Sequence, residues 1–294
     1  SHLSLGNLEA YADTIADDGP IALIGPRPGD LVVDGTALRE RRDRRLYRDR
    51  DIRLFSKKLE LHLSDDGSAA WVADEISYRV PYAGREAALA LRYTALYVRR
   101  AGRWEILAEH MSYPLAIDRV VDAAGSERLP RLGKMGTQLA AEAEAVASIA
   151  RLVHVGSADY RKNHLSTAPA SLQWLPTPEG EYRASEITSA VRIGELFGSS
   201  AKTQRTGIIA QVTASGSVAW VAEQFFVRSR FNYEDLVVPV RALYVFKRSG
   251  EQWKIVQSHL SVPVSDGLLN ELVFGERKLS DKNREKAGHT AVSP

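Results

Sequence analysis

The chain contains an internal repeat. The residues Trp104–Pro114 return as Trp253–Pro263, with Trp, Ile, His, Ser and Pro at the same places and a displacement of 149 positions. The motif Ala-Trp-Val-Ala at residues 70–73 recurs at residues 219–222 with the same displacement. A third correspondence, displaced by 150, matches Gly6, Pro26 and Pro28 to Gly156, Pro176 and Pro178. Three segments in one order at one spacing indicate a domain that is written twice.

Composition excludes several classes of protein. The 294 residues suggest about two domains, and 39 basic against 37 acidic side chains create no global field that would attract nucleic acid or a membrane. The absence of cysteine excludes disulfides, thiolate metal sites and cysteine nucleophiles. No apolar run reaches the ~18 residues that a membrane span needs. We therefore expect no nucleic-acid partner and no membrane insertion; no signal peptide is visible, the compartment stays open, and the cytoplasm is slightly favoured.

Hydrophobic periodicity and turn residues predict the same order of elements in both halves. In the first half we expect helices over residues 5–15 and 36–45, and strands over residues 21–24, 51–64, 69–80, 87–100 and 103–113. In the second half we expect helices over residues 137–155, 157–165 and 185–196, and strands over residues 172–175, 203–213, 217–228, 237–247 and 252–262. Helices grouped ahead of antiparallel hairpins predict the α+β class, with a curved, mostly antiparallel sheet packed on helices in each domain.

These elements set the expected boundaries. The first domain spans residues 1–118, a polar linker spans 119–134, the second domain spans 135–274, and a polar tail at 275–294 is expected to be disordered. The helix over residues 137–155 has no counterpart ahead of Gly6. Either the natural chain begins before Ser1-His2, which looks like a cloning remnant, or the first domain is built without that helix. In either case an apolar surface of the first domain is expected to lack its cover.

Several motifs resemble a known superfamily. The ending W-x-I-V-x-x-H-x-S-x-P, the turn P-x-P-G-[DE] and the strand D-D-G-x-x-A-W-V-A are similar to the SnoaL-like branch of the nuclear transport factor 2-like (cystatin-like α+β) superfamily. The kinase II association domain of the same superfamily has a similar ending. The resemblance covers residues 5–114 and 137–263, and it implies two tandem cone-shaped domains, each enclosing a pocket. Members include ketosteroid isomerase-like enzymes, polyketide cyclases, dehydratases and binding or assembly domains without catalytic activity.

The resemblance also implies how the two domains meet, because the outer sheet face of such domains commonly forms a dimer interface. Strict strand alternation places Trp104 and His110 on one face and Glu109 and Tyr113 on the other. We therefore predict an internal pseudo-dimer in a monomeric chain. Its contact residues are expected to be Trp71, Trp104, His110, Trp220, Trp253 and His259. In the alternative interpretation, the two histidines are general bases.

The opposite face supplies the candidate pocket residues. Asp74 and Glu223 occupy the same repeat position, opposite Trp71 and Trp220. A carboxylate in an apolar cavity could move a proton, with Tyr78 donating a hydrogen bond to an oxyanion, so Asp74 and Tyr78 are the candidate catalytic pair. The other expected ligand-binding residues are Arg92, Glu109, Tyr113, Glu223, Phe225 and Arg241. In the alternative, the carboxylates are solvated or pair with Arg92 or Arg241 at the sheet rim.

The leading functional prediction is binding of an apolar or ring-shaped small molecule, with one pocket per domain. The first alternative is a cofactor-independent isomerase, cyclase or dehydratase that uses a pocket carboxylate, and the second is an assembly module without a ligand. The arginine-rich run Arg39–Arg50 contains interleaved acidic residues and is interpreted as a solvated helix rather than a nucleic-acid patch. No nucleotide-binding motif and no metal-ligand spacing occur, so we expect neither a cofactor nor a metal.

Overall fold

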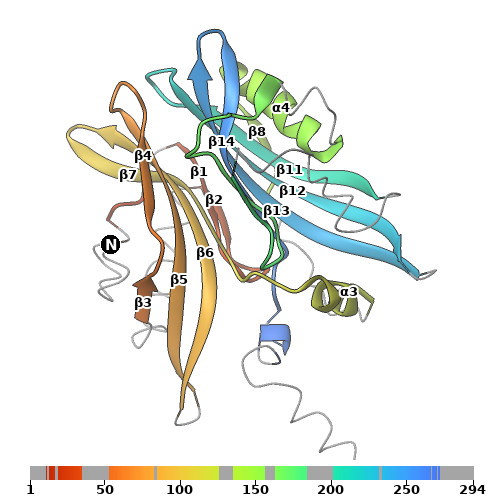
Figure 1. Ribbon diagram of the computed structural model, residues 1–294. Helices are drawn as coiled ribbons and strands as arrows, with labels where there is room; N and C mark the ends of the chain where they lie inside the picture. Colours follow the sequence, from red (N-terminus) through yellow and green to blue (C-terminus); the bar gives the residue numbers. More distant parts are fainter. Residues whose placement is uncertain are drawn as a thin grey trace, which may run out of the picture.

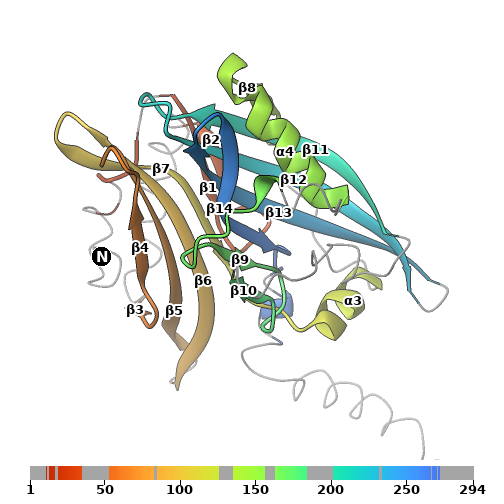
Figure 2. The ribbon, with the colours of Figure 1, turned by 45° about the horizontal axis from the view of Figure 1, so that its top comes forward.

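The computed structural model describes residues 11, 13–16, 19–34, 53–82, 85–125, 135–155, 163–183, 201–231, 234–265, 267–269 and 271. In these residues the chain forms two mixed β-sheets with few helices, one sheet from each half of the sequence. Figure 1 shows the sheets side by side, the first mainly in orange and the second in cyan and blue. Figure 2 shows the same arrangement from a direction turned by 45°.

The first sheet has seven strands. Six of them follow the order β2-β1-β7-β6-β5-β3, and β4 also pairs with β5. All neighbours are antiparallel except β1 and β7. The strands are β1 (Pro20–Ile24), β2 (Leu31–Asp34), β3 (Arg53–Ser56), β4 (Glu60–Leu63), β5 (Ala69–Tyr82), β6 (Arg85–Arg100) and β7 (Arg103–Ser112).

The second sheet repeats this plan and adds one edge strand, in the order β10-β9-β14-β13-β12-β11-β8. The β9–β14 and β8–β11 pairs are parallel. Strands β12 to β14 have the lengths of β5 to β7 at the displacement of 149. The strands are β8 (Thr137–Leu139), β9 (Leu172–Trp174), β10 (Glu181–Arg183), β11 (Lys202–Val212), β12 (Val218–Phe231), β13 (Glu234–Ser249) and β14 (Gln252–Ser261).

Two helices pack on the second sheet. The helix α4 (Glu144–Val155), after the 3₁₀ turn η1 (Ala141–Ala143), covers β11 and β12. The helix α3 (Ile117–Gly125) packs on β13, with Val120 fully buried. We use the term helix face for the sheet face that α4 covers and for the corresponding face of the first sheet. The opposite faces of the two sheets lie against each other, and we refer to them as the contact faces.

A mixed cluster of buried side chains joins the contact faces. It includes Trp71, Leu96 and Val98 of the first half and Trp220, Leu243 and Val245 of the second. A second cluster fills the space between α4 and the helix face of β12 and β13; its members include Val146, Ala150, Val221, Tyr244 and Phe246. The fully buried side chains of Trp220, Tyr244 and Phe246 show that the second half has a well-packed core on both sides of its sheet.

The structure differs from the sequence prediction in three elements. The predicted helix over residues 137–155 starts as strand β8, because residues 137–139 pair with the edge of β11 and this pairing overrides the helix propensity of the alanine-rich segment. The predicted strand over residues 51–64 is split into β3 and β4, because the N–H of Lys58 bonds to the Asp74 carboxylate. The helix α3 spans Ile117–Gly125, so it covers the end of the predicted first domain and the first part of the predicted linker. The predicted helices over residues 36–45 and 185–196, like the arginine-rich run and the tail, lie outside the described residues, as do most of residues 5–15 and 157–165.

Candidate functional site

A buried arginine of the first half reaches the proline-containing loop of the second. Arg92 of β6 is 5% exposed. Its Nη1 donates hydrogen bonds to the carbonyl oxygens of Leu175 and Thr177, each at 2.8 Å, and its Nη2 donates one to Pro178 at 2.7 Å. The guanidinium carbon also lies 5.7 Å from the ring centre of Trp174. Burial lowers the pKa of Arg92, but three carbonyl acceptors suit a charged guanidinium.

An arginine of the second half makes the equivalent contact with the proline-containing loop of the first half. Arg241 of β13, the counterpart of Arg92, is fully buried. It donates from Nη1 to the carbonyls of Gly25 at 3.3 Å and Arg27 at 2.9 Å, and from Nη2 to that of Pro28 at 2.5 Å. Burial lowers the pKa of Arg241 to about 10, so the side chain stays charged at neutral pH. Each arginine therefore anchors the proline loop of the other half. Both lie on the contact faces rather than on the helix faces, and their predicted role in ligand binding stays a prediction.

The backbone strengthens both anchors. The N–H of Val264 donates to the carbonyl of Pro26, and the N–H of Leu115 donates to that of Pro176, each at 2.8 Å. The neck of each loop is closed by one hydrogen bond of 2.7 Å, from Gly25 to Asp30 and from Leu175 to Gly180. The facing positions are so close that a Cβ on either glycine would lie about 2.5 Å from the side chain opposite, at 2.5 Å for Gly25 and 2.6 Å for Gly180. One of the two neck positions must therefore be glycine, and the halves place it at opposite ends of the loop.

Two histidines stack between the sheets. The rings of His110 and His259 have centroids 4.0 Å apart and planes 18° apart. The Nε2 of His110 is hydrogen-bonded to Oγ of Ser261, and the Nε2 of His259 to Oγ of Ser112, both at 2.7 Å. Burial lowers the pKa of His110 to about 3 and that of His259 well below its usual 6.5. Both rings are therefore neutral at physiological pH, and each is bonded to the serine of the other half.

The surroundings of the two histidines differ. The Nδ1 of His259 lies 3.1 Å from Oγ1 of Thr94, which also accepts a hydrogen bond from Gln257 at 3.0 Å. The counterpart of Thr94 is Leu243, which has no polar side-chain atom. Within the described residues, the Nδ1 of His110 has no hydrogen-bond partner. The reciprocal contact is thus satisfied on one side and incomplete on the other.

Only part of the predicted interface set lies between the sheets. Trp71 and Trp220 belong to the buried cluster of the contact faces. Trp104 is 38% exposed, and Trp253 lies beside Arg248 on the other side of its sheet. The prediction is wrong for Trp104 and Trp253, because Leu107 and Val256 are bulge residues without partners in the register of the last hairpins. A bulge residue reverses the alternation, so the residues before it face the opposite way.

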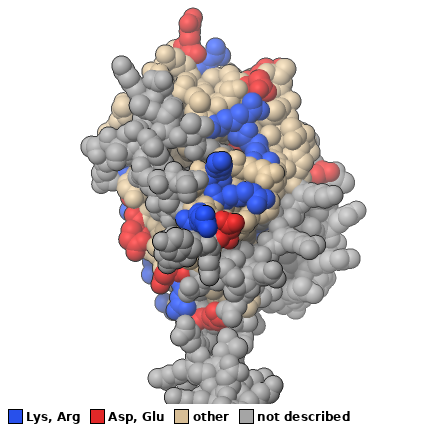
Figure 3. Space-filling model, turned by 90° about the vertical axis from the view of Figure 1, so that its right-hand side faces the viewer, with Lys and Arg blue, Asp and Glu red and all other residues tan. Residues whose placement is uncertain are grey.

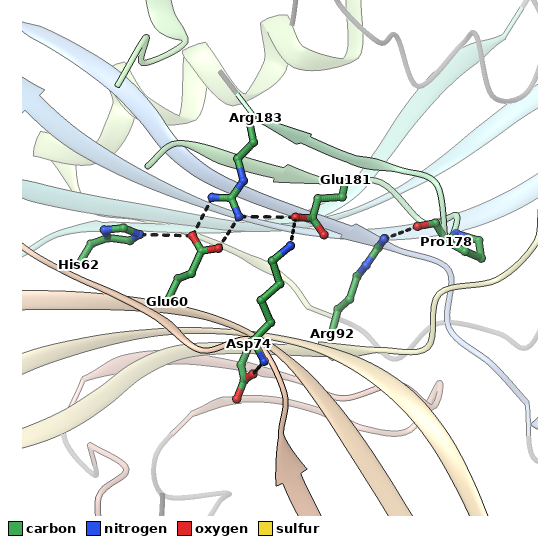
Figure 4. A network of polar contacts seen from close by, with 8 residues as sticks. Glu60, His62, Asp74, Arg92, Pro178, Glu181 and Arg183 are labelled. Carbon is green, nitrogen blue, oxygen red and sulfur yellow. Dashed lines mark hydrogen bonds and ion pairs between the residues drawn. The ribbon is translucent and has the colours of Figure 1, made fainter. Parts of the chain in front are cut away.

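Ion pairs flank one edge of the contact (Figure 4). Lys58 forms an ion pair with Glu181 at 2.7 Å. Arg183 forms a bidentate ion pair with Glu60 and a longer contact of 3.5 Å with Glu181. Hydrogen bonding to Arg183 lowers the pKa of Glu60. The opposite edge is apolar, because the counterparts of these residues include Leu31 and Ile209, which pack in the contact-face cluster.

A polar cluster lies on the helix face of the first sheet. Glu109, which is 3% exposed, accepts hydrogen bonds on one carboxylate oxygen from the hydroxyls of Tyr11 and Tyr93, the latter at 3.1 Å. The hydroxyl of Tyr97 lies 3.3 Å from that of Tyr93. Burial, followed by the Glu109 charge, raises the pKa of Tyr93 well above 10, and burial raises that of Tyr97. The phenols therefore stay protonated and act as donors around one carboxylate, an arrangement that we call the tyrosine cluster.

The second half has no such cluster at the matching positions. Glu109, Tyr93 and Tyr97 correspond to Ser258, Ala242 and Phe246. Sequence reasoning selected Glu109 but missed the tyrosines. The available signal was that Tyr93 and Tyr97 alternate onto the face of Glu109 in the neighbouring strand.

The other predicted pocket residues have separate surroundings. Asp74 is 4% exposed, and its Oδ1 accepts the N–H of Lys58 at 3.1 Å, which fixes the connection between β3 and β4. Glu223 is fully buried and pairs with Arg205 at 2.7 Å, rather than with Arg241 as the alternative expected. Phe225 and Tyr113 are buried in the apolar core. The side chain of Tyr78 lies outside the described part, so the catalytic pairing of Asp74 with Tyr78 stays a prediction.

No group of three or more His, Asp or Glu side chains among the described residues could hold a metal ion. No helix in the same part of the chain is long and apolar enough to span a bilayer. Figure 3 shows Lys and Arg side chains gathered across the described part of one face, with acidic side chains nearby. The absence of a nucleic-acid partner stays a prediction.

Two sequence segments identify the family. A family model described as the SnoaL-like domain matches residues 1–116 and 191–265. The chain belongs to the SnoaL-like domain family, and the resemblance inferred from the motifs is confirmed. No curated protein matches the chain.

Solved structures similar to this chain include three from bacteria. A nuclear transport factor 2-like protein of unknown function from Pseudomonas putida has 17% identity over 39% of this chain and 78% of its own, with a TM-score of 0.33. A protein named as a candidate calcium/calmodulin dependent protein kinase II association domain, from Xanthomonas campestris, has 24% identity over 38% and 76%, with a TM-score of 0.31. A candidate ketosteroid isomerase from Shewanella frigidimarina has 12% identity over 42% and 98%, with a TM-score of 0.35.

Proposed function

We propose that the first half binds a small ring-shaped ligand with one carbonyl or hydroxyl group at the tyrosine cluster. The observation that supports this most is the buried carboxylate of Glu109 with tyrosine hydroxyls directed at it. Apolar sites that recognise small molecules commonly contain a few converging polar groups of this kind. The protonated phenols can donate to a carbonyl oxygen, and Glu109 can accept from a ligand hydroxyl.

We propose further that the chain is an internal pseudo-dimer, in which the second half is a permanent partner for the first. The reciprocal anchors of Arg92 and Arg241 support this, because each half supplies the same element and receives the same element. Contacts of this kind are expected of a twofold interface between like subunits. The second half, whose helix face has apolar or small side chains at the positions of the tyrosine cluster, then stabilises the first without a counterpart of that cluster.

Acid–base catalysis is the second candidate, and the position of Glu109 favours it over Asp74. Asp74 accepts a main-chain N–H and holds a strand connection, whereas Glu109 is surrounded by proton-carrying phenols. In a β,γ-unsaturated ring ketone, Glu109 would take the proton between the carbonyl and the double bond. Tyr93 would donate a hydrogen bond to the enolate oxygen, and the same proton would return to the distant alkene carbon. No oxidant or cofactor is consumed.

Calorimetric titration with 2-naphthol, a neutral ring-shaped hydroxyl compound, tests the binding proposal. We expect Glu109→Gln to weaken binding by about tenfold or more, since it replaces a charged acceptor, worth about 1.4 kcal/mol or more. Ser258→Ala, at the counterpart position, should leave binding unchanged. Equal affinity in the Glu109 variant would contradict the proposal. Conversion of 3-cyclohexenone to its conjugated isomer, measured in the same variants and in Asp74→Asn, separates catalysis from binding.

A further inference from the structure

A cavity of about 860 Å³ lies between the halves, away from the tyrosine cluster. Its walls come from β4 and Trp71 of the first half, and from residues 165–171 and the β13–β14 hairpin of the second. Cavities that hold small organic ligands typically have volumes of about 300–1,000 Å³. The side chains in the lining determine which ligand chemistry this cavity accepts.

The polar part of the lining consists mainly of hydrogen-bond donors and positive charge. Lys247, Arg248 and Lys254 line the cavity with Asp65 as the one acidic residue among its lining side chains. Lys254 donates one hydrogen bond, to the carbonyl of Asn163 at 2.6 Å, and an ammonium group has three donors. Lys247 forms an ion pair with Asp65 at 2.7 Å, but the Asp65 side chain is 84% exposed. Such an exposed pair contributes little to stability, so the anionic group of a ligand can take the place of the Asp65 carboxylate at little cost in free energy.

Two buried donors in the lining are unused. Ser171 and Trp71 are each 5% exposed, and their Oγ and Nε1 atoms have no hydrogen-bond partner within the described residues. Trp220, the counterpart of Trp71, has an equally unpartnered indole nitrogen, so Trp71 alone does not distinguish this cavity. Ser171 does, because a buried hydroxyl without a partner costs about 1–3 kcal/mol, which a ligand acceptor would relieve.

The two sides of the contact differ at these positions. The counterparts of Lys247, Lys254 and Ser171 are Val98, Glu105 and Ile21, and both Val98 and Ile21 are buried in the contact-face cluster. The repeat thus carries apolar or acidic residues on one side and cationic or hydroxyl residues on the other. The repeated fold therefore does not require hydrogen-bond donors at the positions of Lys247, Lys254 and Ser171.

The apolar part of the lining indicates what the anion carries. Trp71, Leu165 and Val256 supply apolar side chains to the lining. A ligand with an apolar body would contact these side chains and gain about 25 cal/mol for each Å² of its apolar surface that is removed from water.

We propose that this cavity binds an organic anion, with a carboxylate or sulfonate group on an aromatic or aliphatic body. Lys254 and Lys247 attract the anionic group, Ser171 donates a hydrogen bond to it, and Trp71, Leu165 and Val256 contact the apolar body. The site is separate from the tyrosine cluster and does not depend on the function proposed for it.

Titration of the whole chain with 8-anilinonaphthalene-1-sulfonate at low salt tests this site, with the neutral N-phenyl-1-naphthylamine as the matched probe. The substitutions Lys247→Val and Lys254→Glu install the residues of the opposite side. We expect each to weaken sulfonate binding by about tenfold, and the pair by more, while Asp65→Asn strengthens it about two- to threefold by releasing Lys247. Ser171→Ile, also taken from the opposite side, should weaken it too.

Two controls keep the outcome specific. The Glu109→Gln variant must retain wild-type affinity for the sulfonate, because the tyrosine cluster lies elsewhere. Unchanged affinity in the double lysine variant, equally tight binding of the neutral probe, or loss of binding in Glu109→Gln would each overturn the proposal. Both lysines are at the protein surface, so their substitution should leave the melting temperature within a few degrees of wild type. The test therefore stands even if Ser171→Ile does not fold.

Discussion

The two halves of the chain have nearly identical strands but different helix faces. In the first half, a buried carboxylate and three tyrosines occupy the face, whereas the second half has serine, alanine and phenylalanine at the matching strand positions. The contact faces also differ, because one edge is joined by ion pairs and the other by apolar packing. A repeated fold can therefore keep its mutual contacts while one copy keeps a polar site and the other becomes a packing partner.

The arginine anchors should give the largest effect. Arg241→Met and Arg92→Met each leave three carbonyl groups of the opposite loop without their donor, and we expect a loss of about 3–5 kcal/mol in the free energy of unfolding. Arg228→Met, on an exposed part of β12, should cost less than about 0.5 kcal/mol. Denaturant unfolding measures all three. A cost near that of Arg228→Met for either buried arginine would show that the anchors do not hold the halves together.

The histidine pair should make stability depend on pH. Both rings are neutral in the folded protein, with the pKa of His110 at about 3 and that of His259 well below 6.5, whereas the unfolded chain binds protons as the pH falls below about 6.5. Their contribution is complete above pH 6.5 and is lost progressively between about 6.5 and 3. Between pH 6.5 and 5.5 we expect the two sites to remove about 2 kcal/mol.

A double variant, His110→Asn with His259→Asn, supplies the control for that measurement. Its free energy of unfolding should be nearly flat between pH 6.5 and 5.5, where carboxylates such as Glu60 do not yet titrate. The same slope in wild type and double variant would assign the pH dependence to other groups.

The difference between Thr94 beside His259 and Leu243 at the counterpart position should have a smaller effect on stability. Thr94→Val removes the oxygen that serves His259 and Gln257, and we expect a cost of about 1–3 kcal/mol. Leu243→Thr gives His110 a possible partner but removes buried apolar surface, so the two contributions should cancel to within about 1 kcal/mol. Thermal unfolding of the two variants sharpens the comparison, and equal costs would mean that the two histidines have equivalent surroundings.

The ion-paired edge should have the smallest effect. Arg183→Met breaks pairs that are about one-quarter exposed, and we expect a cost of at most about 1 kcal/mol that shrinks as salt rises. Ile209→Val, on the apolar edge, should cost a similar amount, about 0.5–1.5 kcal/mol, at every salt concentration. Denaturant unfolding of both variants at several salt concentrations tests this difference. A cost of Arg183→Met that did not depend on salt would contradict the view that ion pairs hold this edge.

Much of the fold follows from the sequence, because the displacement of 149 fixes the correspondence between the halves and the hairpin strands alternate clearly. The bulges at Leu107 and Val256 could not be predicted, since both residues are ordinary strand formers and a bulge is evident only from pairing with the neighbouring strand. For that reason Trp104 and Trp253 were assigned to the wrong face.

The candidate site was predictable only in part. The face of Glu109 follows from alternation, but the approach of Tyr11 is a contact between residues 98 positions apart, which no local pattern encodes. The contacts of Arg92 and Arg241 are with the other half of the chain, and strand alternation within one half gives no information about them. The sequence therefore suggested that both arginines bind a ligand. Two features of the sequence could have indicated these contacts: the arginines occupy matching repeat positions, and each half has a matching Pro-x-Pro turn.

Chemical-shift mapping of backbone amides during titration with 2-naphthol tests most directly the claim that one half carries the site. We predict saturable shifts at Tyr93, Tyr97 and Glu109, with the counterparts Ala242, Phe246 and Ser258 unmoved. Shifts of similar size in both sets, or shifts only in the second half, would contradict the division of roles between the two copies.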